Sequence, residues 1–159
     1  MYNQIDSNKR KTLFLFLIFF GLLIGIGWAL SYIYDDQSIL FIAVIIAVIQ
    51  SWVSYFYSDS IALATTKAKI ASPEQYGELN RLVENLAITA GLPKPKVYVI
   101  NDQSPNAFAT GRDPKHAAIA VTTGLLEVLD RRELEGVLAH ELAHVGNRDI
   151  LIMTVAVTL

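Results

Sequence analysis

Two long runs without a charged side chain constrain this chain more than any other feature. The first extends from Thr12 to Tyr34 and the second from Gln37 to Ser58. Each exceeds the roughly 20 apolar residues that a helix needs to cross about 30 Å of hydrocarbon. Only Asp35 and Asp36 carry charge between them, so the connection is short. We therefore expect a transmembrane hairpin of two antiparallel helices within residues 1–58.

Basic residues on both sides of this hairpin predict its orientation. Lys9, Arg10 and Lys11 precede the first run, Lys67 and Lys69 follow the second, and the intervening turn has none. Because basic flanks stay in the cytoplasm, we expect a multi-pass protein of the cell (inner) membrane whose downstream segment faces the cytoplasm. A cleaved signal peptide is the alternative, but its apolar region is usually about 7–15 residues and no second span follows it.

The composition of the chain argues against several classes of function. The chain has 53% hydrophobic residues, and the two apolar runs account for the excess over an ordinary soluble domain. It contains no cysteine, which excludes disulfides and thiolate metal sites. A net charge of -2 without a basic patch argues against a nucleic-acid partner. Within the first run, Gly21, Gly25 and Gly27 are candidates for close helix packing, since Gly21 and Gly25 have the small-xxx-small spacing.

The pentapeptide His140-Glu141-Leu142-Ala143-His144 carries the strongest chemical signal. On a helix, histidines four residues apart place two imidazoles on one face, where they can bind one zinc ion. In such a motif the glutamate is the general base that takes a proton from the attacking water. The alternative is a chance match, with both histidines in ordinary core or surface contacts.

The surrounding sequence favours a helix through this motif. Asp130 and Glu133 form a capping box, and an apolar stripe follows at helical spacing. We expect this helix to begin at Arg131 and to run unbroken into the apolar residues 150–159. Those ten residues are too short to span a membrane alone, so they read as the start of a third membrane helix.

Between the hairpin and the motif, the sequence predicts one helix and two strands. Ser72 is an N-cap followed by Pro73, and Gly91 ends the helix that they begin. Residues 96–100 and 116–122 read as strands. The segment 104–111 between them contains a brief extended piece and a turn, so a hairpin is expected there. Its edge either pairs with an extended peptide substrate or is an ordinary sheet edge. His116 is the third histidine of the chain and is expected to be structural.

These motifs together resemble the HtpX-type membrane zinc metalloproteases, which are related to the CAAX prenyl proteases. The resemblance covers the basic N-terminus, the hairpin, residues 104–111, residues 118–126 and residues 140–149. It implies that His140 and His144 bind one zinc ion and that Glu141 is the base. It also implies a substrate-binding edge, formed by Asn106, Ala107 and Phe108.

The fold that follows is an α+β membrane protein. It consists of a transmembrane hairpin with spans at about 12–34 and 37–58, a partial zincin-like metalloprotease domain at 59–149, and the start of a third membrane helix at 150–159. The resemblance further implies a quality-control endopeptidase that is embedded in the lipid bilayer. The resemblance implies that this enzyme hydrolyses peptide bonds of misfolded or damaged membrane proteins.

One departure from the family pattern concerns the third zinc ligand. Family members supply a glutamate from a later helix, and Asn147 and Ile150 occupy the Gly and His positions of the longer H-E-x-x-H-x-x-G-x-x-H motif. We therefore expect an N-terminal fragment whose third ligand lies beyond Leu159 and which is inactive alone. A non-catalytic membrane-anchored binding module with a residual motif is the alternative from another class. A prenyl-protein protease is disfavoured because it would need many more spans.

The predicted orientation can be tested by labelling single cysteines, since the chain has none of its own. A Gln37→Cys variant should react with a membrane-impermeant thiol reagent added outside the cell, because this position lies in the turn between the spans. A Ser72→Cys variant should react only after the membrane is permeabilised. Reversed labelling of the two positions would overturn the cytoplasmic placement.

Overall fold

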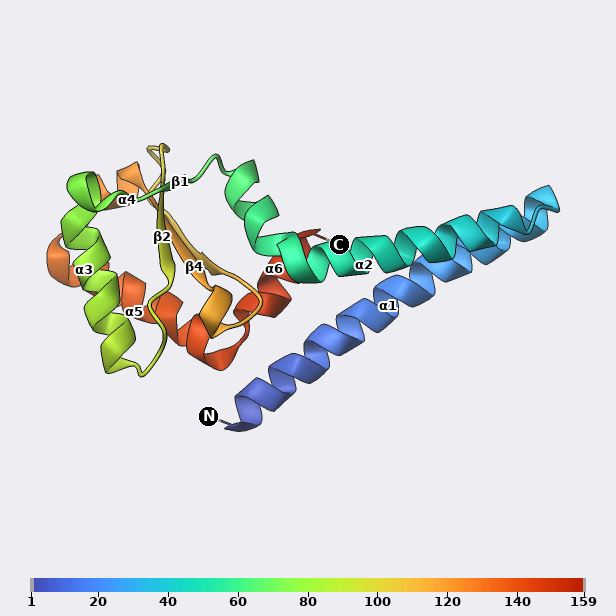
Figure 1. Ribbon diagram of the computed structural model, residues 1–159, viewed down its shortest axis with the longest axis horizontal. Helices are drawn as coiled ribbons and strands as arrows, with labels where there is room; N and C mark the ends of the chain where they lie inside the picture. The colour runs from blue at the N-terminus through green and yellow to red at the C-terminus, as the bar shows by residue number, and fades with distance from the viewer. Residues whose placement is uncertain (1, 159) are drawn as a thin grey trace.

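The computed structural model describes residues 2–158, with side chains described from residue 5 to residue 156. A helical hairpin extends away from an α/β body (Figure 1). The hairpin consists of α1 (Tyr2–Tyr34) and α2 (Ser38–Thr65). Asp35 turns the chain between them with a left-handed φ of 51°, and the carboxylate of Asp36 accepts the N–H of Ser38 at 2.8 Å.

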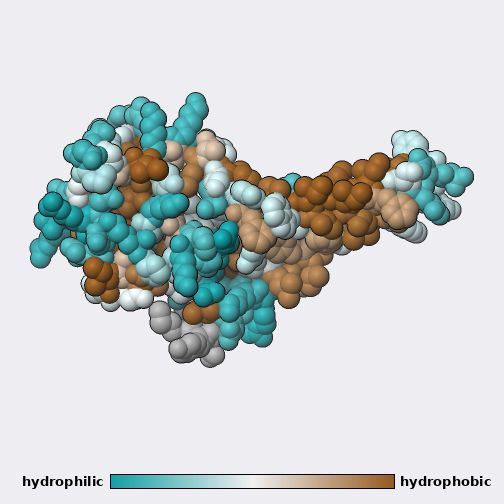
Figure 2. Space-filling view, in the orientation of Figure 1, coloured by the Kyte–Doolittle hydropathy of each residue, from teal (hydrophilic) through white to brown (hydrophobic). Residues whose placement is uncertain are grey.

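Both hairpin helices are long and apolar enough to cross a membrane by length and composition. Only 6% of the most apolar window of α1 and 11% of that of α2 is buried, which distinguishes them from the core helices of a soluble protein. Figure 2 shows the resulting hydrophobic surface along the hairpin and polar side chains at its tip. Both helices extend beyond the expected spans, α1 at its start and α2 to Thr65.

The close contact within the hairpin occurs at Gly27 and not at the small-xxx-small pair. A Cβ placed on Gly21 or on Gly25 would meet nothing within 4 Å. A Cβ on Gly27 would instead overlap the Cβ of Ala43 on α2. The prediction that Gly21 and Gly25 mediate helix packing is therefore wrong, because these two residues lie on a face of α1 that α2 does not cover.

The body contains a four-stranded sheet in the order β1-β2-β4-β3. The strands are β1 (Lys69–Ile70), β2 (Lys96–Ile100), β3 (Ala107–Thr110) and β4 (Ala118–Thr122). β2 and β4 are parallel, whereas β1 and β3 each pair antiparallel with a neighbour and form the two edges. The predicted hairpin of β3 with the following strand is confirmed.

The strand expected at 116–122 begins two residues later than predicted. Pro114–His116 forms a short 3₁₀ helix, η1. The carboxylate of Asp113 accepts the backbone N–H groups of Lys115 and His116 at 2.8 and 3.0 Å, and this cap holds them out of the sheet. β1 was not predicted, since two residues carry no periodic signal.

Helices cover both faces of the sheet. α3 (Pro73–Thr89) and α5 (Arg131–Asn147) pack through the main core, together with β2, β4 and the short α4 (Thr123–Val128). On the other face, Leu63 near the end of α2 packs in a second cluster with β2 and β4. The predicted caps are present, with Ser72 accepting the N–H of Gln75 and Asp130 forming both halves of its capping box with Glu133.

The helix that carries the histidine motif does not continue into the apolar tail. α5 ends at Asn147, Arg148 adopts the left-handed conformation with φ 58°, and α6 (Ile150–Thr158) begins two residues later. The prediction of an unbroken helix is therefore wrong. α6 packs against α2 and β3.

The contact at Gly27 predicts how alanine substitutions will affect the hairpin. Gly27→Ala should lower the free energy of unfolding in detergent by about 1–3 kcal/mol, because the added methyl group overpacks the contact with Ala43. Gly25→Ala is the matched control and should be neutral or stabilising by up to about 1 kcal/mol through helix propensity. Equal destabilisation by the two substitutions would contradict the packing seen at Gly27.

Candidate active site

The two histidines of α5 converge through their outer ring nitrogens. Nε2 of His140 lies 3.1 Å from Nε2 of His144, and the two rings are nearly perpendicular. Nδ1 of His144 lies 2.9 Å from Oδ2 of Asp149. A neutral His144 ring that donates its Nδ1–H to this carboxylate keeps the lone pair of Nε2 free for a metal.

This arrangement fits a zinc ion. Two nitrogens at about 2.0–2.1 Å from zinc with tetrahedral geometry lie about 3.3 Å apart, close to the 3.1 Å between the two Nε2 atoms. A hydrogen bond from the distal ring nitrogen to a carboxylate is the usual support of a zinc-binding histidine. Within residues 2–158, no group of three or more His, Cys, Asp or Glu side chains is placed to hold a metal.

Glu141 connects α5 to the edge strand β3. Its Oε2 accepts the backbone N–H of Ala109 at 2.9 Å. The N–H of Thr122 donates a hydrogen bond to the carbonyl of Asn106, just before β3. In the register of the two strands, Phe108 and Thr110 therefore also direct their backbone groups toward β4. Since pairing alternates along an antiparallel ladder, the backbone groups of Ala107 and Ala109 point outward. The free edge of β3 therefore faces Glu141.

A cavity of about 550 Å³ lies in front of this edge. Glu141 and His144 of α5 line it on one side, and Met153 and Thr154 of α6 line it further along. The rest of its lining comes from the end of α2 and from β3, namely Ile61, Ala62, Thr65, Thr66, Ala107, Phe108, Ala109 and Thr110. A carboxylate, an imidazole and a strand edge that pairs with no further strand thus meet in one largely apolar space.

Of the residues singled out from the sequence, some line this cavity and others lie outside it. Ala107 and Phe108 line it, whereas Asn106 precedes β3 and its backbone is bonded to Thr122. His116 lies in η1, where its Nδ1 is 2.9 Å from both carboxylate oxygens of Asp113.

Two functional residues were missed by the sequence reasoning. Asp149 was given no role from the sequence, yet its carboxylate lies 2.9 Å from Nδ1 of His144. A signal for it exists in the sequence, since a carboxylate follows the second histidine by five residues. Ala109 has no side-chain signal, because its contribution to the site is a backbone N–H.

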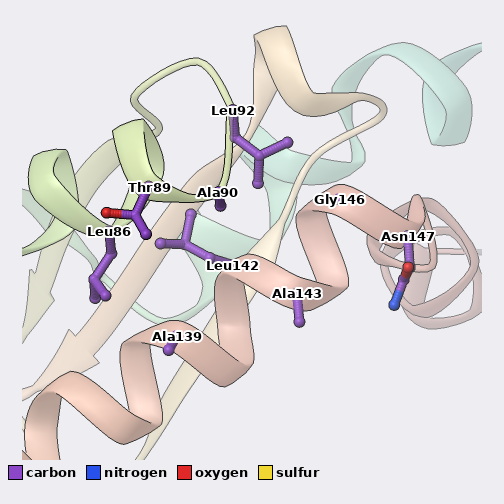
Figure 3. A pocket seen from close by; sticks show the side chains of 9 residues that line it. All are labelled: Leu86, Thr89, Ala90, Leu92, Ala139, Leu142, Ala143, Gly146 and Asn147. Carbon is purple, nitrogen blue, oxygen red and sulfur yellow. The ribbon is translucent and has the colours of Figure 1, made fainter. Parts of the chain in front are cut away.

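A second groove lies on the far side of α5, between that helix and α3 (Figure 3). It has a volume of about 350 Å³, and the residues that line it include Ala139, Ala143 and Gly146 of α5 and Leu86 of α3. At 100° per residue, these α5 positions face away from His140, Glu141 and His144. None of its lining residues is titratable. The chemistry of α5 is therefore confined to the β3 side.

Comparisons with known proteins agree with this geometry. The model of the family described as "Peptidase family M48" matches residues 73–159. A "Protease HtpX homolog" of Caldanaerobacter subterraneus subsp. tengcongensis is 48% identical over 158 residues, which cover 98% of this chain and 52% of the relative. A "Protease HtpX homolog" of Pyrococcus furiosus is 52% identical over 139 residues, which cover 87% and 47%.

A solved structure shares the fold. The crystal structure of S. mikatae Ste24p aligns with a TM-score of 0.54 at 22% identity, covering 99% of this chain and 37% of that protein. The α+β fold with two apolar N-terminal helices is thereby confirmed. The chain spans about half the length of the curated relatives that it matches. The family match covers more than half of the chain and includes the histidine motif, so this chain belongs to peptidase family M48.

Proposed function

We propose that this chain forms the N-terminal part of a membrane-anchored zinc endopeptidase. His140 and His144 are the zinc ligands, and Glu141 is the general base. The observation that carries this proposal is the convergence of the two Nε2 atoms beside a glutamate that is already bonded to the edge strand of the sheet. The family assignment supports the same chemistry.

In the proposed reaction, each residue of the site has a separate role in peptide hydrolysis. Zinc, when bound, supplies a Lewis acid that polarises the scissile carbonyl and makes water more acidic. Glu141 takes a proton from the attacking water and returns it to the nitrogen of the leaving amine. An extended substrate pairs with the outward backbone groups of Ala107 and Ala109. This pairing takes the Ala109 N–H away from Glu141 and so frees the carboxylate for proton transfer.

A third protein ligand is needed to complete the zinc site, because catalytic zinc usually takes three. The described residues provide no third group beside His140 and His144. We place this ligand outside residues 2–158 and, from the family resemblance, expect a glutamate. Without it, residues 1–159 would bind zinc weakly and leave the attacking water poorly oriented.

The hairpin anchors the enzyme in the inner membrane with the catalytic domain in the cytoplasm. Its exposed apolar surface and its basic flanks support this placement. Since Ile61, Ala62, Thr65 and Thr66 of α2 line the catalytic cavity, the site lies close to the bilayer surface. We therefore propose misfolded or damaged membrane proteins as substrates, cleaved where their segments leave the membrane.

Replacement of Glu141 tests the assignment of the base. Glu141→Gln in the full-length protein should retain bound zinc, because both histidines are unchanged, and should lose peptidase activity by about 100-fold or more. Zinc content and hydrolysis of a fluorogenic peptide are measured on the same preparation, with Glu135→Gln on the same helix as control. Wild-type hydrolysis by Glu141→Gln would overturn the assignment of Glu141 as the general base.

Replacement of Asp149 tests its role as a positioning residue. Asp149→Ala should weaken zinc binding in the full-length protein by about 10- to 100-fold, since the His144 ring loses the partner of its Nδ1–H. Asp149→Asn keeps an acceptor oxygen and should recover part of that affinity. Competition titration with a zinc chelator measures both variants. Unchanged affinity in Asp149→Ala would mean that the carboxylate does not support the metal site.

A further inference from the structure

A third cavity, which the proposed chemistry does not use, lies where the base of the hairpin meets the α/β body. Its volume is about 360 Å³. It is enclosed by the start of α1, one residue of α2, the loop after β3 and the turn between α5 and α6. The lining residues are Lys9, Thr12, Leu13, Phe16, Tyr55, Arg112, Asp113, Arg148 and Leu151.

The charged lining is predominantly basic. Three cations, Lys9, Arg112 and Arg148, face one anion, Asp113. Burial raises the pKa of Asp113, but hydrogen bonds from the side chain of His116 and the N–H of Lys115 outweigh it, so the pKa lies below its ordinary value. Asp113 is thus ionised at neutral pH and already bonded to η1, where His116 Nδ1 is 2.9 Å away.

The cations are only partly neutralised by this anion. Arg112 Nε lies 3.7 Å from Asp113 Oδ2, and its guanidinium carbon lies 5.4 Å from the centre of the Phe56 ring. In the part of the chain that the structure describes, Lys9 and Arg148 have no ion-pair partner. Among the described residues, the cavity therefore keeps an excess of positive charge that no ion pair to Lys9 or Arg148 offsets.

The backbone at Arg148 adds a second observation. Arg148 adopts the left-handed conformation, which costs an ordinary side chain free energy and which usually falls to Gly or Asn at a helix end. Arginine stands there instead, and its side chain lines the cavity. Strained backbone at a residue with a charged, unpaired side chain is typical of a binding site.

The cavity also changes from polar to apolar along one direction. On α1, Lys9 lies at its polar end and Leu13 and Phe16 follow one and two turns later, about 10 Å at 1.5 Å per residue. Leu151 on α6 adds to the apolar end. Lys9 belongs to the basic cluster that precedes the first apolar run, so in the proposed membrane placement this transition coincides with the boundary between headgroups and hydrocarbon.

We propose that this cavity binds the headgroup of an anionic phospholipid. The phosphate lies between Arg112, Arg148 and Lys9, since guanidinium groups bind phosphate oxygens in pairs. The start of an acyl chain follows Leu13, Phe16 and Leu151. The proposal rests on the membrane placement given above. A lipid in this position links α1 to the turn that carries Asp149, and so joins the hairpin to the support of His144.

Native mass spectrometry of the full-length protein in detergent tests this site. The protein is titrated with phosphatidylglycerol or with phosphatidylcholine of the same acyl chains, and retained lipid is counted. The test variants are Arg148→Asn, which tolerates the left-handed backbone, and the double variant Arg112→Gln/Arg148→Asn. The control is Lys67→Gln/Lys69→Gln, which removes two cations beyond the second apolar run and outside the cavity.

Wild-type protein should retain phosphatidylglycerol in preference to phosphatidylcholine. Each cation near an anionic lipid contributes about fivefold, so Arg148→Asn should bind about fivefold and the double variant about 30-fold more weakly. The lysine control should stay within about twofold of wild type. Equal retention by the variants and the wild type, or equal retention of the two lipids, overturns the proposal.

Two further measurements separate the remaining explanations. Inorganic phosphate at millimolar concentration should not displace the lipid; full displacement would identify a free-phosphate site and overturn the lipid assignment. Glu141→Gln should bind lipid like wild type, so failure of the proposed peptidase chemistry and failure of the lipid site are distinguishable. Thermal unfolding of each variant shows whether the substitution leaves the fold intact. If Arg112→Gln unfolds the protein, Arg148→Asn alone carries the test.

Discussion

Three side chains on one face of α5, Leu138, Leu142 and Val145, are 0%, 2% and 0% exposed. Their burial against the sheet fixes the rotation of the helix about its axis, because turning it would expose all three. With that rotation fixed, Glu141 and His144 face the cavity beside β3, and His140 lies next to His144. The bond from the Ala109 N–H to Glu141 then sets the distance between the helix and the strand edge. The geometry of the site thus depends first on apolar packing and only then on its polar contacts.

The end of α5 completes the site through a break in the helix. On a continuous helix, Asp149 would lie about 140° around the axis from His144, since five residues turn through 500°. The left-handed Arg148 ends the helix and brings the Asp149 carboxylate back to within 2.9 Å of His144 Nδ1. This conformation costs roughly 1–2 kcal/mol for a residue with a Cβ. The charged hydrogen bond between Asp149 and His144 is of the order needed to offset it.

The sequence predicted those features that depend only on contacts between neighbouring residues. Ser72 and Asp130 predicted helix starts because a capping side chain bonds within its own first turn. The sequence could not place Asp149 beside His144, because this contact requires an unfavourable backbone at Arg148 that only the assembled fold stabilises. Nor could it show that Ala109 presents its N–H to Glu141, since that depends on α5 packing beside β3, a contact between residues 32 positions apart in the sequence. Contacts between distant segments leave no periodic pattern in the sequence.

The end of α2 and the α/β body together line the cavity beside Glu141. The end of α2 packs through Leu63 on the sheet face opposite the main core, and the adjacent Ile61 and Ala62 line the catalytic cavity with Glu141. In the proposed function, a substrate that adds to β3 would therefore also contact the helix that continues from the second apolar run. Because α6 packs against both α2 and β3, a shift of α2 relative to the body would alter the cavity on two sides. The position of the hairpin relative to the body is thus coupled to the shape of the cavity through these contacts.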